Sequence, residues 1–539
     1  MYFKTINNIL IIFVIYQFLL LGSAMADILY HEIHGYGTQT EAGLTGGVIK
    51  VANLNNDGAG SFREACQTDA PRLIVFEVGG VINLEMRSIN IDDPYITVAG
   101  QTAPNPGITL IKGSLNVRTH DVVIQHIAIR PGEAGQPKMS GWEPDGMGTD
   151  GSEAYNIVFD HCSATWSVDE NLSVSGPGDS DPMTSSHDVT LYKCLIAECL
   201  FNSTHAKGAH SMGTLLHDGV VNVSIIGCLY AHNNQRNPLF KGNSRAVVVN
   251  SVIYNSGERC IHMADYGTNS SIITGISKGA LVGNVWIKGT DSSTRPFVTS
   301  SKSRESGWVY LEGNILKERS GADAAAIDNY LTQLDSVPLW PDGLIPQPAN
   351  VALHDVLTTV GARPGERDPI DARIVLSVID GTGAIIDSEE EVGGYPQYAQ
   401  SSRDLYVPGG RDTRKIWLDS LSAGLDTDEF LDTSPLIPVI TTIDTQTPAI
   451  RNEYTLNLTN YPNPFNPTTT IRYDIPKASQ VTLTIYNMNG QVVERLVNQK
   501  QEPGFYSVSW DARNVSTGVY FYRIQADGFQ QVKKMLLIK

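Results

Sequence analysis

The stretch Val223-Ser224-Ile225-Ile226-Gly227-Cys228 is a short run rich in β-branched residues that ends in a small apolar residue. Similar runs recur along the chain, and their last residues are separated by roughly 23 to 35 positions. The other runs span residues 122–127, 157–162, 189–194, 247–251, 280–284 and 309–314. Repeats of this length predict a solenoid in which each coil stacks on the one before it.

Three cysteines support the stacking of neighbouring coils. Cys162, Cys194 and Cys228 fall at the same point of three successive runs, and free cysteine packs well as a small apolar residue. We therefore expect the three thiols to form a column inside the solenoid. An ordinary β-sandwich is the alternative, but it should show turns about every eight to twelve residues. The repeat favours the parallel β-solenoid.

Length and charge limit the function. The chain has 539 residues and a formal net charge of -18, so we expect more than one module. The negative charge argues against nucleic acid, because Lys and Arg contacts to phosphate dominate that binding. An acidic ligand would also be repelled unless a bound cation or a local basic strip reverses the field. Six cysteines are too few for a disulfide scaffold in so long a chain.

The first 26 residues have the features of a signal peptide. Lys4 precedes an apolar run over residues 9–21, and Ala24-Met25-Ala26 fits a small-residue cleavage site. A membrane anchor is the alternative, but the apolar run is short for a spanning helix. We expect the mature chain to begin near Asp27 and to be exported.

The chain changes character near residue 401. We interpret residues 27–400 as the β-solenoid with a tail that packs along it, and residues 401–454 as a linker, since residues 441–448 are rich in Thr. Residues 455–539 contain alternating apolar and polar runs and an Asn489-Gly490 hairpin turn. They predict a small antiparallel β-sandwich.

Charged residues follow several of the predicted strands. Arg236 and Lys241 lie in the segment 232–241, which follows a strand rich in Val, Ile and Tyr. Asp145, Asp160, Asp169 and Glu170 lie beside short strands some sixty to ninety residues earlier. If these strands stack as coils of one solenoid, the carboxylates and the cations meet on one face. Such a face suits an acidic polymer.

The central region, about residues 43 to 395, resembles the pectate lyase superfamily, specifically polysaccharide lyase family 1. The matching motifs occur in the family's order, which makes the resemblance specific. They are Gly46-Gly47-Val48, the segments 53–63 and 97–104, Phe159-Asp160-His161-Cys162-Ser163, and Arg236-Asn237-Pro238. The resemblance implies a right-handed parallel β-helix and β-elimination of uronate polymers such as pectate.

The resemblance also implies a calcium site. Asp145, which opens Asp145-Gly146-Met147, and Asp169 match calcium ligands, and Glu170 is adjacent. From the residues alone, Asp150 competes with Asp145 for this role. Oxygen ligands suit Ca²⁺, and no His/Cys cluster in the sequence favours zinc. The family often has a further Asp where this chain has Ser173, which removes one charged ligand.

By the same resemblance, Arg236 matches the catalytic base, and Lys207 and Lys241 match basic residues that hold substrate carboxylates. Lys241 stands where Arg is common, so a bidentate grip becomes a point charge. Arginine is an awkward base because it is almost always protonated, and this predicts an alkaline optimum or a partly electrostatic role. Lys207 is as well explained by solvation. We interpret His126 and the Asp160-His161 pair as structural.

Three classes of function remain open at this point. A calcium-dependent pectate lyase is favoured. A glycoside hydrolase on a similar β-helix would use paired carboxylates, which Asp145, Asp150, Asp169 and Glu170 could supply. A non-catalytic pectin-binding surface protein would show no turnover. Within the lyases, the carboxylate cluster favours a de-esterified substrate. We expect a monomer.

The C-terminal region has its own resemblance. Tyr461-Pro462-Asn463-Pro464-Phe465-Asn466-Pro467, residues 518–523 and Lys533-Lys534-Met535-Leu536 resemble the C-terminal sorting domain of type IX secretion substrates. This implies recognition by a secretion machinery and a protein that is secreted or attached to the cell surface. A carbohydrate-binding or spacer sandwich is the alternative.

Overall fold

The computed structural model divides the chain into two compact units, Met1–Asp444 and Thr445–Lys539. The signal-peptide region and the Thr-rich stretch 441–448 lie outside the described residues. The structure describes residues 33–176, 184–264, 275–301, 305–429, 431–433, 436, 458–461, 465–475, 479–488, 490–501, 504–526 and 529–538.

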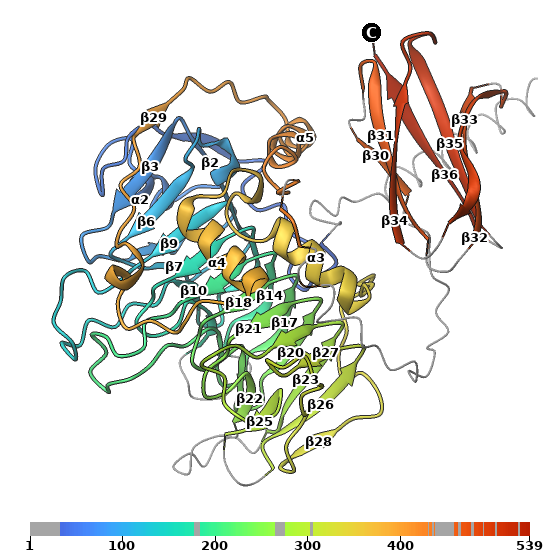
Figure 1. The fold of residues 1–539 in the computed structure, drawn as a ribbon. Helices are drawn as coiled ribbons and strands as arrows, with labels where there is room; N and C mark the ends of the chain where they lie inside the picture. Colours follow the sequence, from blue (N-terminus) through green and yellow to red (C-terminus); the bar gives the residue numbers. More distant parts are fainter. Residues whose placement is uncertain are drawn as a thin grey trace, which may run out of the picture. The chain divides into compact units, whose positions relative to one another are not determined.

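The first unit is a right-handed parallel β-helix, whose described strands form three long sheets (Figure 1). The first sheet contains β1 (Gly47–Val51), β2 (Arg72–Phe76), β5 (Ile96–Ala99), β8 (Val122–Gln125), β11 (Tyr155–Asp160), β14 (His187–Tyr192), β17 (Val221–Ile226), β20 (Arg245–Val249), β23 (Ser277–Val282), β26 (Gly307–Glu312) and β28 (Leu331–Gln333).

The second and third sheets complete each coil. The second contains β4 (Ile89–Ile91), β7 (Leu115–Val117), β10 (Met147–Asp150), β13 (Leu172–Ser175), β16 (Leu215–Leu216), β19 (Leu239–Lys241), β22 (Ile261–Ala264) and β25 (Val298–Ser300). The third contains β29 (Ser401–Ser402), β3 (Val78–Asn83), β6 (Ile108–Ile111), β9 (Ile127–Arg130), β12 (Ser163–Thr165), β15 (Leu195–Ala197), β18 (Leu229–Ala231), β21 (Val252–Tyr254), β24 (Val285–Ile287) and β27 (Ile315–Lys317).

The cysteine column is confirmed. Asp160 pairs with Tyr192, and Tyr192 with Ile226, so the cysteines two residues further on stack in register. Cys162, Cys194 and Cys228 are fully buried free thiols, and each donates to a backbone carbonyl of the preceding coil at 3.5 Å. The column lies within the main apolar core. The repeat read from the sequence therefore gives the actual register of the coils.

The turn between the first and third sheets requires left-handed backbone. His126, His161 and Lys193 occupy it on successive coils with φ of 56°, 49° and 49°, and Gly227 follows with φ of 63°. Glycine adopts this conformation without the steric cost that a Cβ adds. Non-glycine residues in such a column are unusual, and the side chains of the two histidines become important below.

The chain after the last coil returns along the β-helix. The helices and 3-10 turns are α2 (Phe62–Cys66), η1 (Gly100–Thr102), α3 (Ala349–Thr359), η2 (Pro364–Glu366), α4 (Pro369–Asp380), η3 (Glu389–Val392) and α5 (Arg411–Ser422). Helices α3 and α4 lie over the third sheet (Figure 1), where Leu353 and Ile374 pack with Leu229 and Val252. None of the described helices is long and apolar enough to cross a membrane.

A buried ion pair fastens this tail. Arg130 of β9 is fully buried, and its Nη2 lies 2.7 Å from Asp368 Oδ2 and 2.8 Å from Asp371 Oδ1. Asp368 also caps α4, because its Oδ1 accepts hydrogen bonds from the backbone N–H groups of Ile370 and Asp371.

The tail extends further than predicted, which corrects the start of the linker. β29 pairs antiparallel with β3, Leu418 of α5 is buried in an apolar cluster with Val123 and Val158, and Ser422 reaches His126. The first part of the predicted linker 401–454 therefore packs on the β-helix. Its strand repeats had ended, but an amphipathic helix replaces them, which the strand pattern did not anticipate.

The second unit is a small antiparallel β-sandwich, as predicted. One described sheet contains β30 (Leu458–Tyr461), β31 (Thr468–Ile475) and β34 (Gly504–Asp511), and the other contains β33 (Val492–Gln501), β32 (Ser479–Asn487), β35 (Gly518–Ala526) and β36 (Phe529–Leu537). Its core includes Trp510, Tyr522 and Ile485.

Candidate active site

The acidic residues and the arginine singled out in the sequence lie in turns that precede strands of the second sheet. Asp145 precedes β10, Asp169 and Glu170 precede β13, and Arg236 precedes β19. Because these strands are stacked in register, their N-terminal ends meet at one edge of the sheet. The structure therefore brings together residues that are far apart in the sequence.

Backbone contacts fix the turns relative to one another. The N–H of Gly146 donates to the carbonyl of Glu170 at 2.9 Å. Met212 forms parallel bridges with Glu170 on one side and Gln235 on the other, and the N–H of Thr214 donates to the carbonyl of Arg236 at 2.6 Å. These bonds set the spacing of the side chains above them.

A buried amide ladder supports the same turns from inside. Asn171 donates to Asn233 Oδ1 at 3.1 Å, and Asn233 donates to Asn237 Oδ1 at 3.1 Å. The ladder is nearly inaccessible to solvent. Asn171 thus links the turn before β13 to the turn before β19, where Asn233 and Asn237 both lie.

Three carboxylates form what we call the carboxylate cluster: Asp145, Asp169 and Glu170. One oxygen from each lies within 4.8 Å of the other two. Asp145 Oδ1 accepts a hydrogen bond from the backbone N–H of Glu170 at 2.9 Å. The Glu170 side chain is 6% exposed and that of Asp169 is 28% exposed. The cluster is thus held on one side and open on the other.

The three carboxylates of the cluster lie close together, and their surroundings shift the pKa values of Asp145 and Asp169 in opposite directions. Burial and the neighbouring charge of Asp169 raise the pKa of Asp145 to about 8. Burial acts to raise the pKa of Asp169 as well, but the hydrogen bond and charge of His210, with Arg236 and His205, outweigh it and lower that pKa. A cation at this point would relieve the repulsion between the carboxylates.

Arg236 contacts the cluster directly. Its Nη1 forms an ion pair with Glu170 Oε1, and its backbone is left-handed with φ of 60°. Burial lowers the pKa of Arg236, although the charges of Asp169 and Asp145 act in the opposite direction. A non-glycine residue in this conformation is costly, and the stacked turns described above hold it there.

The donor set fits calcium. Oxygen ligands from carboxylates are what Ca²⁺ prefers, and Asp145, Asp169 and Glu170 are the residues that would hold it. Ser173 lies in β13, where its hydroxyl accepts a hydrogen bond from the N–H of Leu215 at 3.1 Å. The Ser173 hydroxyl is therefore engaged in a hydrogen bond to the backbone of the next coil. Asp150, the alternative to Asp145, lies at the far end of β10 and is 4.0 Å from Arg118.

The structure adds to the site two histidines, His205 and His210, that the sequence analysis did not assign to it. His210 Nε2 lies 3.2 Å from Asp169 Oδ1, and His205 Nε2 lies 3.6 Å from Asp169 Oδ2. Their rings stack with centroids 3.6 Å apart. The pair occurs in one loop with Lys207, which was the only sequence signal for it. His210 contacts Asp169 directly and His205 stacks on His210, so the pair borders one carboxylate of the cluster.

The two lysines differ in their surroundings. Lys241 ends β19, and its Nζ lies 2.8 Å from Asp218 Oδ2 and 3.2 Å from His217 Nε2. Asp218 is almost fully buried, so Lys241 neutralises a buried charge. Lys207 is exposed on the loop beside His205.

Comparison with known proteins identifies both parts of the chain. A probable pectate lyase C from Emericella nidulans is 30% identical over 386 residues, covering 69% of this chain and 81% of the relative. A probable pectate lyase C from Aspergillus flavus is 31% identical over 391 residues, covering 70% and 83%. Residues 459–539 match the family described as secretion system C-terminal sorting domain.

Solved structures were also compared. The cedar-pollen allergen jun a 1 gives a TM-score of 0.42 at 13% identity, covering 59% of this chain and 89% of its own. A thermostable pectate lyase gives 0.41 at 12% identity, covering 61% and 97%. From the sequence relatives, the chain belongs to the pectate lyase family of polysaccharide lyases, and it carries a secretion-system sorting domain at its C-terminal end.

Proposed function

We propose that this protein is a calcium-dependent pectate lyase that cleaves de-esterified polygalacturonate by β-elimination and releases 4,5-unsaturated oligogalacturonates. The observation that carries the proposal is the meeting of the carboxylate cluster with Arg236 at one edge of the second sheet. The curated relatives named as probable pectate lyases support the substrate class.

The reaction removes the C5 proton of a galacturonate and breaks the C4–O bond, so a C4=C5 double bond forms and the leaving oxygen takes up a proton. Bound Ca²⁺ would offset the charge that develops on the C6 carboxylate. Arg236 is the group we assign to the C5 proton. Its burial lowers its pKa, which favours proton acceptance at alkaline pH over an exposed arginine.

The remaining residues position these groups. Glu170 pairs with the Arg236 guanidinium, and His210 contacts Asp169 with His205 stacked on it. We assign Lys207 and Lys241 to the substrate's carboxylates. Lys241 is already paired with buried Asp218, so its position is fixed before substrate binds, whereas Lys207 is exposed.

The test is the ultraviolet absorbance of products from polygalacturonate, measured with and without a chelator. Unsaturated products that disappear with chelator and return with added Ca²⁺ support the proposal. Saturated products would indicate hydrolysis by the paired carboxylates instead, and binding without turnover would indicate a surface-binding protein. Unsaturated products that persist in chelator would refute the calcium dependence alone.

We also propose an export route. Residues 1–26 act as a signal peptide, and residues 455–539 direct passage through the type IX machinery to secretion or surface attachment. The match to a sorting domain at residues 459–539 supports this. Deleting residues 455–539 should block release from the native host while leaving lyase activity in the lysate. Normal release of the truncated chain would contradict the proposal.

A further inference from the structure

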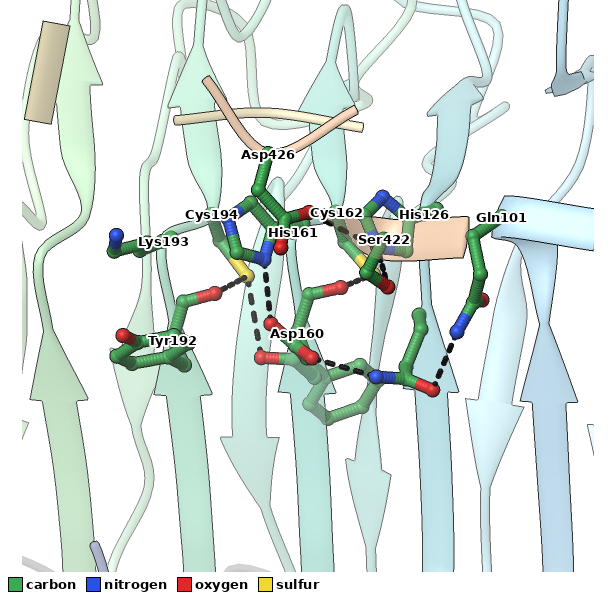
Figure 2. Close-up of polar contacts among 12 residues, drawn as sticks. Gln101, His126, Asp160, His161, Cys162, Tyr192, Lys193, Cys194, Ser422 and Asp426 are labelled. Atoms are coloured by element: carbon green, nitrogen blue, oxygen red, sulfur yellow. Dashed lines mark hydrogen bonds and ion pairs between the residues drawn. The ribbon is translucent and has the colours of Figure 1, made fainter. Parts of the chain in front are cut away.

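A second polar cluster lies away from the candidate active site, in the turn between the first and third sheets. We call it the histidine cluster: His126, His161 and Asp426. His126 and His161 occupy the same turn on neighbouring coils, and Asp426 follows α5 in the tail (Figure 2). One ligand atom of each lies within 4.8 Å of the other two. We propose that this cluster is a site for a divalent transition metal, with Zn²⁺ as the expected ion, that fastens the tail to the β-helix.

The hydrogen bonds at Nδ1 of the two rings leave each Nε2 lone pair as a possible metal ligand. His126 Nδ1 lies 2.8 Å from the carbonyl oxygen of Ala362, and a carbonyl only accepts, so Nδ1 carries the proton. His161 Nδ1 lies 2.6 Å from Asp160 Oδ1, where a carboxylate accepts in the same way. Each ring can therefore present the lone pair of Nε2, the arrangement in which a second partner orients a metal-binding histidine.

Asp160 is itself held in place. Gln101 donates to Gln125 Oε1 at 3.0 Å, and Gln125 donates to Asp160 Oδ2 at 2.7 Å. Figure 2 shows this chain of side chains leading to His161. Because Gln125 engages one oxygen of Asp160, the other oxygen is directed to the His161 ring. A polar network therefore orients the His161 ring. A ring that only filled space in the core would not need such a network.

Two atoms that face the centre of the cluster lack hydrogen-bond partners among the described residues. They are His161 Nε2 and Asp426 Oδ1, both buried atoms. The His161 side chain is 5% exposed. Buried polar atoms are normally satisfied, and an exception calls for an explanation such as an ion. Two such atoms near His126 Nε2 indicate a missing cation.

The separation of His126 Nε2 from Asp426 Oδ1 suits a tetrahedral ion. His126 Nε2 lies 3.6 Å from Asp426 Oδ1, and ligand atoms about 2.0–2.2 Å from Zn²⁺ lie roughly 3.3–3.6 Å apart in a tetrahedron. The rings of His126 and His161 stack at 5.2 Å between centroids with 7° between planes, and one nitrogen of each lies within 4.8 Å of an Asp426 carboxylate oxygen. Imidazole nitrogen with one carboxylate favours Zn²⁺ and similar ions over Ca²⁺.

Two neighbours define the rest of the site. Ser422 Oγ lies 3.1 Å from His126 Nε2, and its hydroxyl donates there; the ion would replace this bond. Lys193, the next residue in the column, pairs with Asp355 at 3.7 Å. Asp160 is engaged at His161 Nδ1, and Asp426 is the carboxylate that lies near His126 Nε2. Since Asp426 comes from the tail, a bound ion would link two segments that no repeat brings together.

The experiment measures Zn²⁺ bound to the full mature chain after dialysis, for wild type, Asp426→Asn, His161→Gln and the control Asp355→Asn. Asp355 is a carboxylate of similar exposure to Asp426, 38% against 32%, and lies outside the cluster. We expect Asp426→Asn and His161→Gln each to lose one equivalent of Zn²⁺ that wild type and Asp355→Asn retain. His210→Gln should also retain it, which separates this site from the histidines that contact Asp169.

Thermal unfolding gives a second readout. Zn²⁺ should raise the melting temperature of wild type and Asp355→Asn, because an ion bound only to the folded state stabilises it, and it should not raise that of Asp426→Asn. Asp426 is partly exposed, so this variant should fold, and near-ultraviolet circular dichroism checks that it does. Equal Zn²⁺ content in all variants, or an equal thermal shift, would overturn the proposal and identify the cluster as a metal-free hydrogen-bond network.

Discussion

The carboxylate cluster and the histidine cluster are built on the same β-helix but differ in how far their side chains are exposed to solvent. Both place side chains from successive coils next to one another. The carboxylate cluster combines oxygen donors with Arg236 and has partly exposed members. The histidine cluster combines ring nitrogens with one carboxylate, and its two rings lie under the tail. The two proposals above thus place a hard and a borderline cation site at different turns of one β-helix.

The strongest test of this contrast replaces Arg236 with lysine. Lysine has a shorter reach and lacks the planar guanidinium that contacts Glu170, so we expect a loss of about 10²–10⁴ in kcat, typical of a displaced acid–base group. Calcium binding should change little. Turnover measured over a calcium titration at alkaline pH checks this, and near-normal turnover would remove Arg236 from proton transfer.

A smaller effect is expected for Asp169→Asn. Losing one charged ligand should weaken Ca²⁺ binding about tenfold or more, about 1.4 kcal/mol, so part of the activity should return when calcium is raised. Asp150→Asn is the matched control, because Asp150 lies on the same sheet outside the cluster. An Asp169→Asn enzyme whose activity does not depend on calcium concentration would show that the carboxylates do not bind the ion. Zn²⁺ at the histidine cluster should be unaffected.

Asp368→Asn tests whether the tail, which covers the histidine cluster, matters to the lyase site. Asparagine can still cap α4 but loses the charge facing buried Arg130, so we expect about 1–3 kcal/mol of lost unfolding free energy. Arg130 remains paired with Asp371. Chemical denaturation measures the cost. Activity at saturating calcium should be retained at temperatures where the variant is folded; loss of activity from a folded variant would contradict the separation of the two regions.

This variant also carries a pH dependence. Burial acts to raise the pKa of Asp368, but the charge and hydrogen bond of Arg130 outweigh it and lower the pKa. A lowered pKa in the folded state means that the stabilisation is present above the unfolded value of about 3.9 and is lost as the pH falls below it. The difference in stability between wild type and Asp368→Asn should therefore shrink below about pH 4. A constant difference between pH 3 and pH 7 would exclude the ion pair as its source.

The last test separates the two lysines, and the smallest effect is expected for Lys207. Lys207→Ala removes an exposed cation, so we expect a rise in KM of a few fold, about 1 kcal/mol or less, with no change in stability. Lys241→Ala leaves Asp218 buried without its partner, so it should lower both substrate affinity and stability, the latter by about 1–3 kcal/mol. Equal effects of the two changes on the melting temperature would contradict the difference in their surroundings.

The sequence alone determined the parts of this protein that depend on the repeat. The strand runs, the cysteine column and the meeting of Asp145, Asp169, Glu170 and Arg236 follow from coils of similar length stacked in register. In a parallel β-helix each coil contacts its neighbours, so positions separated by one repeat become neighbours in space. The sorting sandwich was likewise evident from its motifs and strand alternation.

Only the tertiary structure decided the contacts that the repeat does not encode. The return of residues 401–428 along the β-helix, the approach of Asp426 to His126 and His161, the hold of His205 and His210 on Asp169, and the pairing of Lys241 with Asp218 all belong to this class. Each contact joins a loop or the tail to a coil, and the number of residues between the two partners follows no repeat. Such contacts depend on packing of particular side chains, which periodicity does not specify, and this is why the two histidines read as structural in the sequence form a candidate metal site in the fold.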